Sequence, residues 1–296
     1  MYKNIATQSI HKPLHKTMDI SVDVLRLDQI HPVISGNKWF KLKYHLEAAL
    51  RENKKGIITF GGTYSNHLVA TAVVCRENNL SSTGIIRGEG SFPENDSIRQ
   101  MKEAGMQIIY VTREAYKNKE VLARDFIASN QEYYYVPEGG QSTEGIKGAG
   151  EILSYAGTDY THIISAVGTG TTLTGLINAS SGQQQIIGIC VLKIADTNAN
   201  EIELFIKSNT SKNNYSIIYD YHFGGYARKT DPLIAFMNEL YNYEQIPTDF
   251  VYTGKMFFAT YDLIRQNFFT RGSKLLMVHT GGLQGNRSLP AGTLVF

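Results

Sequence analysis

The residues that could do chemistry gather in short loops rich in glycine and hydroxyl groups. One loop reads Gly168-Thr169-Gly170-Thr171-Thr172, directly after an apolar run and before a helical pattern. Glycine lets a backbone approach a ligand closely, and the first N–H groups of a helix attract an anion. Because three threonine hydroxyls add further donors, we expect this loop to bind a phosphate group. The alternative is a tight strand-to-helix turn, since the loop matches neither the P-loop nor the G-x-G-x-x-G pattern.

Lys38 lies in a second segment, which reads Gly36-Asn37-Lys38-Trp39-Phe40-Lys41-Leu42. A strong helical pattern follows, so this lysine is expected at a helix start, where the positive end of the dipole disfavours its charge. A lysine with a lowered pKa is what Schiff-base chemistry requires. The alternative is that Lys38, Lys41 and Lys43 form the solvated face of a basic helix.

Ser65 and Asn66 follow two glycines and precede an apolar helical pattern over residues 68–76. Their side chains and the free N–H groups of the helix start would form a site for a carboxylate or another anion. An ordinary N-cap is the alternative. Two further loops, residues 136–142 and 278–282, each follow a predicted strand, and the second would bring the hydroxyl of Thr280 to the same edge.

The elements that must position these loops are short apolar runs that alternate with helical patterns. Most of the runs are apolar throughout, which is typical of parallel strands covered on both faces. The alternation predicts a parallel, doubly wound α/β architecture, in which ligands bind beyond the carboxyl ends of the strands. The predicted strands are Val22–Arg26, Gly56–Phe60, Thr83–Arg87, Gln107–Thr112, Tyr133–Val136, His162–Val167, Ile186–Leu192, Ser216–Tyr221 and Lys274–His279.

Two helical patterns carry start or stop signals, and a third is marked by an apolar stripe. Asn95 or Asp96 would cap a helix that Gly105 ends, and Asp231-Pro232 would open another with a cap and a proline in the first turn. The first strong helix is predicted from one apolar stripe, Leu42, Leu46, Ala49 and Leu50.

Composition excludes several classes of protein. The chain has 296 residues, 42% of them hydrophobic, with 29 Lys+Arg against 27 Asp+Glu, so neither nucleic acid nor a membrane is an expected partner. Two cysteines in apolar runs, Cys75 and Cys190, indicate buried free thiols and a cytoplasmic protein. The eight histidines are scattered and no C-x-x-C or H-E-x-x-H spacing occurs, so no metal site is expected. The absence of G-x-S-x-G argues against a hydrolase triad.

One ligand explains these loops together: a phosphorylated aldehyde cofactor held by a lysine, a threonine-rich phosphate cup and a hydroxyl near its ring. On these motifs the chain resembles the aminocyclopropane-carboxylate deaminase / D-cysteine desulfhydrase family. This family lies within the tryptophan-synthase-β-like, fold type II enzymes that use pyridoxal 5′-phosphate (PLP). The resemblance runs from Arg26 to Gly282 and rests most on Gly36-Asn37-Lys38 and on residues 61–66.

The resemblance implies a role for each matching residue. Lys38 would form the Schiff base with PLP and act as the base at the substrate α-carbon, and Ser65 would hold the substrate carboxylate or assist proton transfer. Asn66 would hydrogen-bond the ring hydroxyl of the cofactor. The phosphate would be bound by Thr169, Gly170, Thr171 and Thr172, and the two active-site tyrosines would be Tyr226 and Tyr252.

Two positions bear on the substrate. The ring-opening deaminases of the family have Glu directly after the second tyrosine and Leu at the position of Thr280, whereas this chain has Thr253 and Thr280. A hydroxyl partner, which either threonine could provide, leaves the pyridine ring largely neutral, and expelling a thiolate needs less carbanion stabilisation than opening a strained ring. The resemblance therefore implies β-elimination on a small amino acid such as D-cysteine, which gives pyruvate, ammonia and sulfide.

Three alternatives stay open at this point. They are a 1-aminocyclopropane-1-carboxylate deaminase that yields 2-oxobutyrate and ammonia, a non-catalytic PLP-binding protein, and a phosphate- or nucleotide-binding protein without lysine chemistry. The chain departs from the family at Leu25 and Leu27, and at Tyr64 and His67, where glutamines are common, so the pocket wall differs.

The resemblance also implies two doubly wound parallel-sheet domains with the cofactor in the cleft between them. The large domain would comprise residues 1–46 and 147–296, and the small mobile domain residues 47–146. A homodimer is implied as well.

Overall fold

A computed structural model describes residues 5–11, 19–34, 36–88, 90, 94–193 and 198–296. These residues belong to two compact units. Unit 1 comprises residues 1–31, 35–37 and 149–296, and unit 2 comprises residues 32–34 and 38–148. The predicted large and small domains differ from these units mainly in residues 38–46, which fall in unit 2. Which part of the chain moves stays a prediction.

Unit 1 contains a six-stranded sheet with the strand order β1-β2-β10-β7-β8-β9. All neighbouring strands are parallel except β1, which pairs antiparallel with β2. The strands are β1 (Thr7–Ser9), β2 (Ser21–Arg26), β7 (His162–Val167), β8 (Gln185–Cys190), β9 (Tyr215–Ile218) and β10 (Lys274–His279). Because β10 and β7 are parallel neighbours, the loops that follow them leave the same edge of the sheet.

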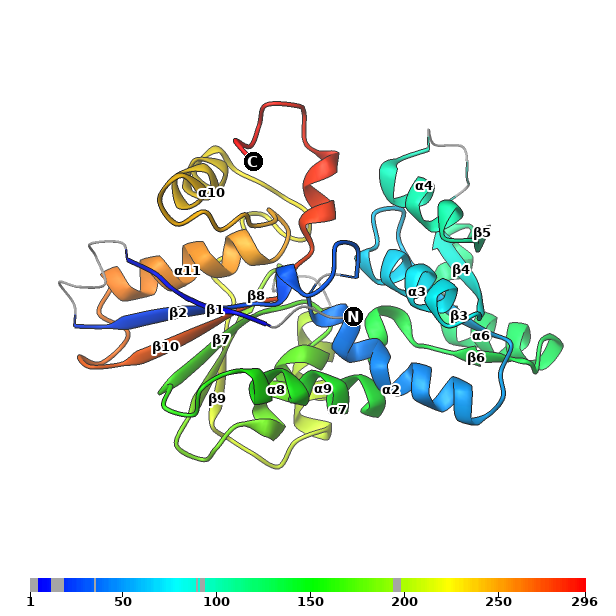
Figure 1. Cartoon of the computed structure of the whole chain (residues 1–296), viewed down its shortest axis with the longest axis horizontal. Helices are drawn as coiled ribbons and strands as arrows, with labels where there is room; N and C mark the ends of the chain where they lie inside the picture. The colour runs from blue at the N-terminus through cyan, green and yellow to red at the C-terminus, as the bar shows by residue number, and fades with distance from the viewer. Residues whose placement is uncertain (1–4, 12–18, 35, 89, 91–93, 194–197) are drawn as a thin grey trace. The chain divides into compact units, whose positions relative to one another are not determined.

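Helices cover both faces of this sheet, with α10 and α11 on one side and α8 and α9 on the other (Figure 1). On the first side, Ile164 of β7 shares a buried cluster with Phe257 of α11. On the second, α8 packs so closely that a Cβ at Gly188 would lie 2.6 Å from Leu173. The helices are α8 (Thr171–Ala179), α9 (Asn198–Ser208), α10 (Asp231–Glu244) and α11 (Thr253–Arg265), with 3-10 turns at η1 (Leu27–Gln29), η3 (Glu151–Tyr155) and η4 (Leu283–Ser288).

Unit 2 contains a four-stranded parallel sheet with the order β5-β4-β3-β6. Successive residues of β3 enter different cores: Ile57 packs with helices α2, α3 and α4, whereas Ile58 and Phe60 pack with α5 and α6. The strands are β3 (Gly56–Gly61), β4 (Ser81–Arg87), β5 (Met106–Val111) and β6 (Tyr133–Tyr135). The helices are α2 (Asn37–Arg51), α3 (Asn66–Glu77), α4 (Asp96–Glu103), α5 (Arg113–Lys117), α6 (Lys119–Ser129) and α7 (Thr143–Gly150), with a 3-10 turn η2 (Glu138–Gly140).

The nine predicted strands and the α/β class are confirmed. β1 was not predicted, because its sequence Thr-Gln-Ser has no apolar run and its strand conformation comes from pairing with β2. Asn95 caps α4 as predicted. Thr230, rather than Asp231, caps α10, and Leu50 is 46% exposed instead of continuing the apolar stripe of α2. Among the helices of the described residues, none has the length and apolarity needed to cross a membrane.

Candidate active site

The predicted phosphate loop joins β7 to α8 in unit 1. Gly170 precedes the helix with a φ of +84°, a left-handed conformation that favours glycine, and no acidic residue lies in the first turn. The hydroxyls of Thr169 and Thr171 lie 3.0 Å apart. A helix start with free N–H groups, clustered hydroxyls and no carboxylate suits a dianionic phosphate group.

Asn37 connects this loop to the segment that carries Lys38. Its Nδ2 donates a buried hydrogen bond of 2.7 Å to Oγ1 of Thr172, and its backbone N–H donates to the carbonyl oxygen of Thr280 at 3.2 Å. The preceding Gly36 has a φ of +74°, and a Cβ there would lie 1.8 Å from the Thr280 oxygen. Only glycine fits at this crossing. The sequence pattern around Lys38 gave no sign of this role for Asn37.

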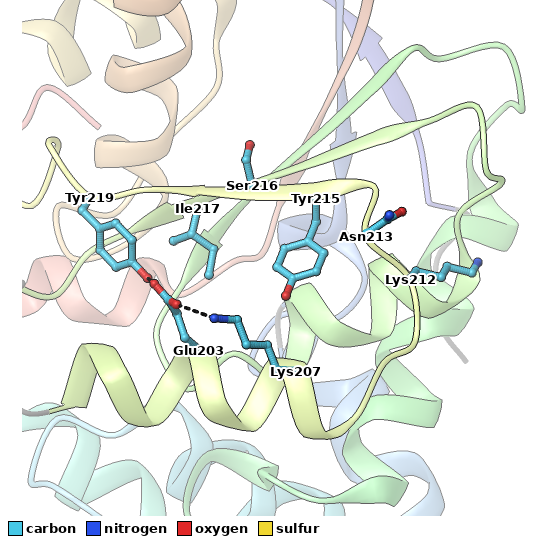
Figure 2. Close-up of a pocket in the computed structure, with 8 residues that line it drawn as sticks. All are labelled: Glu203, Lys207, Lys212, Asn213, Tyr215, Ser216, Ile217 and Tyr219. Carbon is cyan, nitrogen blue, oxygen red and sulfur yellow. Dashed lines mark hydrogen bonds and ion pairs between the residues drawn. The ribbon is translucent and has the colours of Figure 1, made fainter.

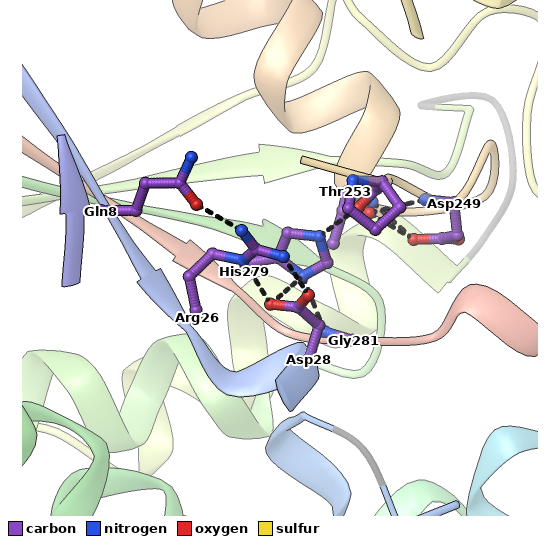
Figure 3. Close-up of polar contacts among 8 residues, drawn as sticks. Gln8, Arg26, Asp28, Asp249, Thr253, His279 and Gly281 are labelled. Carbon is purple, nitrogen blue, oxygen red and sulfur yellow. Dashed lines mark hydrogen bonds and ion pairs between the residues drawn. The ribbon is translucent and has the colours of Figure 1, made fainter. Parts of the chain in front are cut away.

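The turn that carries Thr280 is also held from the opposite side. Nε2 of the fully buried His279 donates to the carbonyl oxygen of Pro247 at 2.7 Å, so its Nδ1 accepts from the backbone N–H of Gly281 at 3.2 Å (Figure 3). The carboxylate of Asp28 lies 3.6 Å from Nδ1 and is paired with Arg26 at 2.7 Å. This buried network fixes the end of β10, whose first following residue is Thr280.

The two predicted tyrosines meet beside the phosphate loop. The hydroxyl of Tyr252 lies 3.3 Å from that of Tyr226, and their rings pack edge to face with centroids 5.9 Å apart. The Tyr252 ring also lies against the loop, because a Cβ at Gly168 would be 3.0 Å from its Cε1. Unit 1 therefore places both phenol groups next to the predicted phosphate loop.

Thr253 is hydrogen-bonded to Asp249 rather than to the tyrosines or the phosphate loop. Its hydroxyl donates to the carboxylate of Asp249 at 2.7 Å and accepts from the Asp249 N–H at 2.8 Å (Figure 3). The same carboxylate accepts from the backbone N–H groups of Val251, Tyr252 and Thr253. Burial raises the pKa of Asp249, and these hydrogen bonds oppose the rise. Thr253 thus belongs to the buried cap of α11, which a sequence pattern of Asp four residues before Thr could have suggested.

Lys38 occupies the second position of α2 and is half-buried. Three residues later, Lys41 is only 3% exposed, and Gly140 of η2 covers its side chain. Burial, together with the charge of Lys38, holds the pKa of Lys41 well below its usual value. The interpretation of these lysines as one solvated helix face is therefore wrong for Lys41.

Ser65 and Asn66 mark the start of α3 in unit 2. Ser65 is the N-cap, since its Oγ accepts from the N–H of Leu68 at 3.2 Å. The next residue, His67, is buried with Nε2 2.8 Å from the hydroxyl of Thr59. Burial and the charges of the two lysines at the start of α2 hold the pKa of His67 well below its usual value, so the ring is neutral. The N-cap interpretation of Ser65 is thus confirmed, and a role toward substrate stays a prediction.

Taken by unit, the predicted residues form two groups. Unit 1 brings the phosphate loop, Thr280, Tyr226 and Tyr252 to one region, with Asn37 joining two of these parts. Unit 2 contains both Lys38 and Lys41. The charges of these two lysines lower the pKa of His67, which directly follows Asn66. The catalytic and cofactor-binding roles of all these residues stay predictions.

A hollow in the surface of unit 1 lies elsewhere, along α9 and the edge strand β9 (Figure 2). Glu203 spans it by pairing with Lys207 at 3.1 Å and accepting from the hydroxyl of Tyr219 at 2.6 Å. None of the predicted site residues lines this hollow.

Comparison with known proteins gives matches over nearly the whole chain. The family described as "Pyridoxal-phosphate dependent enzyme" matches residues 13–281. A putative 1-aminocyclopropane-1-carboxylate deaminase of Pyrococcus horikoshii is 28% identical over 85% of this chain and 81% of its own length. A D-cysteine desulfhydrase of Klebsiella pneumoniae is 26% identical over 87% of this chain and 86% of its own. The crystal structure of an ACC deaminase homologue superposes with a TM-score of 0.83 at 26% identity, covering 96% of this chain and 91% of that one.

Proposed function

Since the chain belongs to the pyridoxal-phosphate-dependent enzyme family, with the fold type II architecture, we propose that it is a lyase acting on a small amino acid. D-Cysteine is the substrate that we propose, with pyruvate, ammonia and sulfide as products. The relatives include both a D-cysteine desulfhydrase and a putative 1-aminocyclopropane-1-carboxylate deaminase, so the latter activity is the second candidate.

The residues present suit PLP. The start of α8 would hold the phosphate through its free N–H groups and the hydroxyls of Thr169, Thr171 and Thr172, with Gly170 allowing close approach. Lys38 would bind the aldehyde, and Asn66 the ring hydroxyl. When bound, PLP supplies an electron sink for the electron pair left on the substrate α-carbon after its proton is removed.

The protein side chains would then handle protons and orientation. Lys38 would take the proton from the α-carbon and carry it for later return. Ser65, whose oxygen already accepts the Leu68 N–H, keeps its own O–H to donate to the substrate carboxylate. The paired phenols of Tyr226 and Tyr252 would donate a proton to the departing sulfur, since two hydroxyls 3.3 Å apart can pass a proton between them.

One observation favours elimination over ring opening. Both hydrogen-bonding roles of the Thr253 hydroxyl are used by Asp249, so the position that carries Glu in the ring-opening deaminases is turned into the helix cap here. Thr280 is 8% exposed, and its hydroxyl makes no hydrogen bond within the described residues. We therefore propose Thr280 as the partner of the pyridine nitrogen. A neutral hydroxyl leaves the ring a weaker electron sink, which suffices when a thiolate leaves from the β-carbon.

The test is a product assay on the purified protein supplied with PLP. D-Cysteine, L-cysteine and 1-aminocyclopropane-1-carboxylate are offered separately, and pyruvate, sulfide and 2-oxobutyrate are measured. We expect pyruvate and sulfide in equal amounts from D-cysteine. 2-Oxobutyrate from the cyclopropane substrate alone would establish the second candidate, and a protein that binds PLP without releasing any product would be a binding protein.

A cytoplasmic homodimer is part of this proposal. Cys75 and Cys190 are both buried free thiols, which fits a reducing compartment. Burial raises the pKa of Cys75 to about 12, so this thiol would stay protonated and unreactive. Sedimentation equilibrium of the purified protein would test the dimer.

A further inference from the structure

Lys255 is a buried cation without a role in the chemistry proposed above. It lies at the third position of α11, and its side chain is fully covered. Its Nζ donates to two backbone carbonyl oxygens, those of His222 at 2.9 Å and Gly225 at 2.8 Å. A buried ammonium group is costly unless hydrogen bonds satisfy it, so these contacts define where the side chain must point.

The two carbonyl groups belong to one strained turn. Phe223 and Ala227 have φ values of +52° and +51°, which non-glycine residues rarely adopt, and Gly224 and Gly225 have φ values of +94° and +120°. Within the turn, His222 O also accepts from Gly225 N at 3.0 Å, and Gly225 O accepts from Arg228 N at 3.2 Å. The ammonium group therefore adds a second, charge-assisted hydrogen bond at each end of residues 222–225, which we name the tether turn.

The tether turn leads directly into Tyr226. This side chain is 53% exposed, and its ring packs edge to face against that of Tyr252. Tyr252 precedes Lys255 by three residues at the start of α11. One helical turn thus carries both the second tyrosine and the ammonium group that anchors the first.

We propose that Lys255 is a positioning residue that sets the separation of the Tyr226 and Tyr252 hydroxyls. The inference rests on the proposed function only for the consequence that this separation matters in catalysis. Without the ammonium group, the tether turn would relax, and the exposed phenol of Tyr226 would shift relative to the hydroxyl of Tyr252. Small displacements of proton-transfer groups reduce turnover more than substrate binding.

The charge of Lys255 gives the arrangement a pH dependence. Burial lowers the pKa of Lys255 to about 8, opposed by the buried carboxylate of Asp249 before α11 and by Cys190 at the end of β8. As the pH rises past this value, the amine keeps two N–H donors but loses the charge that strengthens both bonds. The tether turn should therefore loosen in alkaline solution while α11 stays folded.

The test compares wild-type holoenzyme with Lys255→Met and, as a matched control, Lys274→Met. Lys274 is half-exposed and pairs with Asp159 on the surface, at 2.6 Å. In Lys255→Met we expect faster amide exchange in residues 222–228, an unchanged cofactor spectrum, and a kcat lower by about tenfold to a hundredfold with little change in KM. The double variant Lys255→Met, Tyr226→Phe should have a kcat no lower than that of the slower of the two single variants.

Equal exchange in residues 222–228 of folded Lys255→Met and wild type would overturn the proposal. If that variant does not fold, amide exchange of the wild type at pH 7 and pH 9, corrected for intrinsic rates, decides instead. A loss of protection at pH 9 that is confined to residues 222–228 would support the proposal. Unchanged protection of these residues would overturn it. The exchange readout needs no turnover. A wild-type protein that releases no product would therefore contradict the proposed function, and exchange would still decide whether Lys255 holds the turn.

Discussion

The side-chain amide of Asn37 donates a 2.7 Å hydrogen bond to the hydroxyl of Thr172, a residue 135 positions later in the chain. Asn37 immediately precedes Lys38, and Thr172 lies in the first turn of α8. The covalent neighbour of the proposed cofactor-binding lysine is therefore fixed to the proposed phosphate site. The backbone N–H of the same asparagine reaches Thr280, so one residue links three parts of the proposed cofactor site.

Replacing this asparagine should weaken cofactor binding. In Asn37→Ala the buried Thr172 hydroxyl loses its partner, which we expect to cost about 1–3 kcal/mol of unfolding free energy. The phosphate loop and Lys38 would no longer be tied together, so PLP titration should show weaker binding. Asn178→Ala is the control, because Asn178 donates to Asn209 from the exposed end of α8. Wild-type PLP affinity in Asn37→Ala would show that this bond does not organise the site.

Lys38 itself should be required for the visible absorbance of the bound cofactor. Lys38→Ala removes the only amine proposed to bond to the aldehyde, so we expect the absorbance band and the product release to disappear together. Lys43→Ala serves as the control, since Lys43 lies on the same helix with its amine 5.2 Å from the Tyr44 ring. A band in Lys38→Ala that matches the wild type would remove this lysine from the proposal.

The local part of this structure could be predicted from the sequence. Apolar runs identified the nine strands, because strands covered on both faces are mostly apolar. Glycine- and hydroxyl-rich ends identified the loops. Ser65 as the cap of α3 follows the same local logic, since its partner is three residues away.

The contacts that assemble the site could not be predicted in this way. Lys255 and Gly225 are 30 residues apart, and the Asn37–Thr172 bond spans far more of the chain. Such pairs leave no periodic signal, because they depend on which strands become neighbours in the sheet. The same reason applies to Lys41: a lysine at this spacing looks solvent-exposed until η2 is seen to cover it.

Thr253→Glu is expected to destabilise the protein rather than change its substrate. The added carboxylate would lie buried beside Asp249, and the hydroxyl that completes the helix cap would be lost. A buried, unpaired charge next to a like charge costs about 3 kcal/mol or more, which chemical denaturation would measure. Thr253→Ser keeps the hydroxyl and should unfold close to the wild type. A stable Thr253→Glu protein that gains cyclopropane ring opening would contradict this interpretation of the position.

Thr280→Val should lower turnover without lowering stability. Valine keeps the size and branching of the side chain but removes the hydroxyl proposed to face the pyridine nitrogen. We expect kcat with D-cysteine to fall about tenfold to a hundredfold, as for loss of one positioned hydrogen bond in a transition state. Thr280→Ser should retain most of the activity. Equal kcat values for the valine variant and the wild type would mean that Thr280 is not the partner of the pyridine nitrogen.

The stability of the protein should decline in weak acid because of His45. This ring is 1% exposed, with Nε2 2.8 Å from the hydroxyl of Ser142 and no hydrogen-bond partner for Nδ1 within the described residues. Burial and the charge of Lys41 lower its pKa to about 4, although Glu144 opposes the shift.

Between pH 6.5 and 4 the unfolded chain therefore binds a proton at His45 that the native protein does not. Since stability falls wherever the unfolded state binds more protons, acidification across this window should remove about 3 kcal/mol of unfolding free energy. In His45→Gln the amide can still bond to Ser142 but cannot titrate. The unfolding free energy, measured by urea unfolding, should therefore fall less steeply with decreasing pH, by the contribution of about one bound proton. At pH 8 the ring is neutral in both states, and there the variant should unfold close to the wild type. An equally steep decline in His45→Gln would mean that other groups, His67 first among them, cause the acid sensitivity.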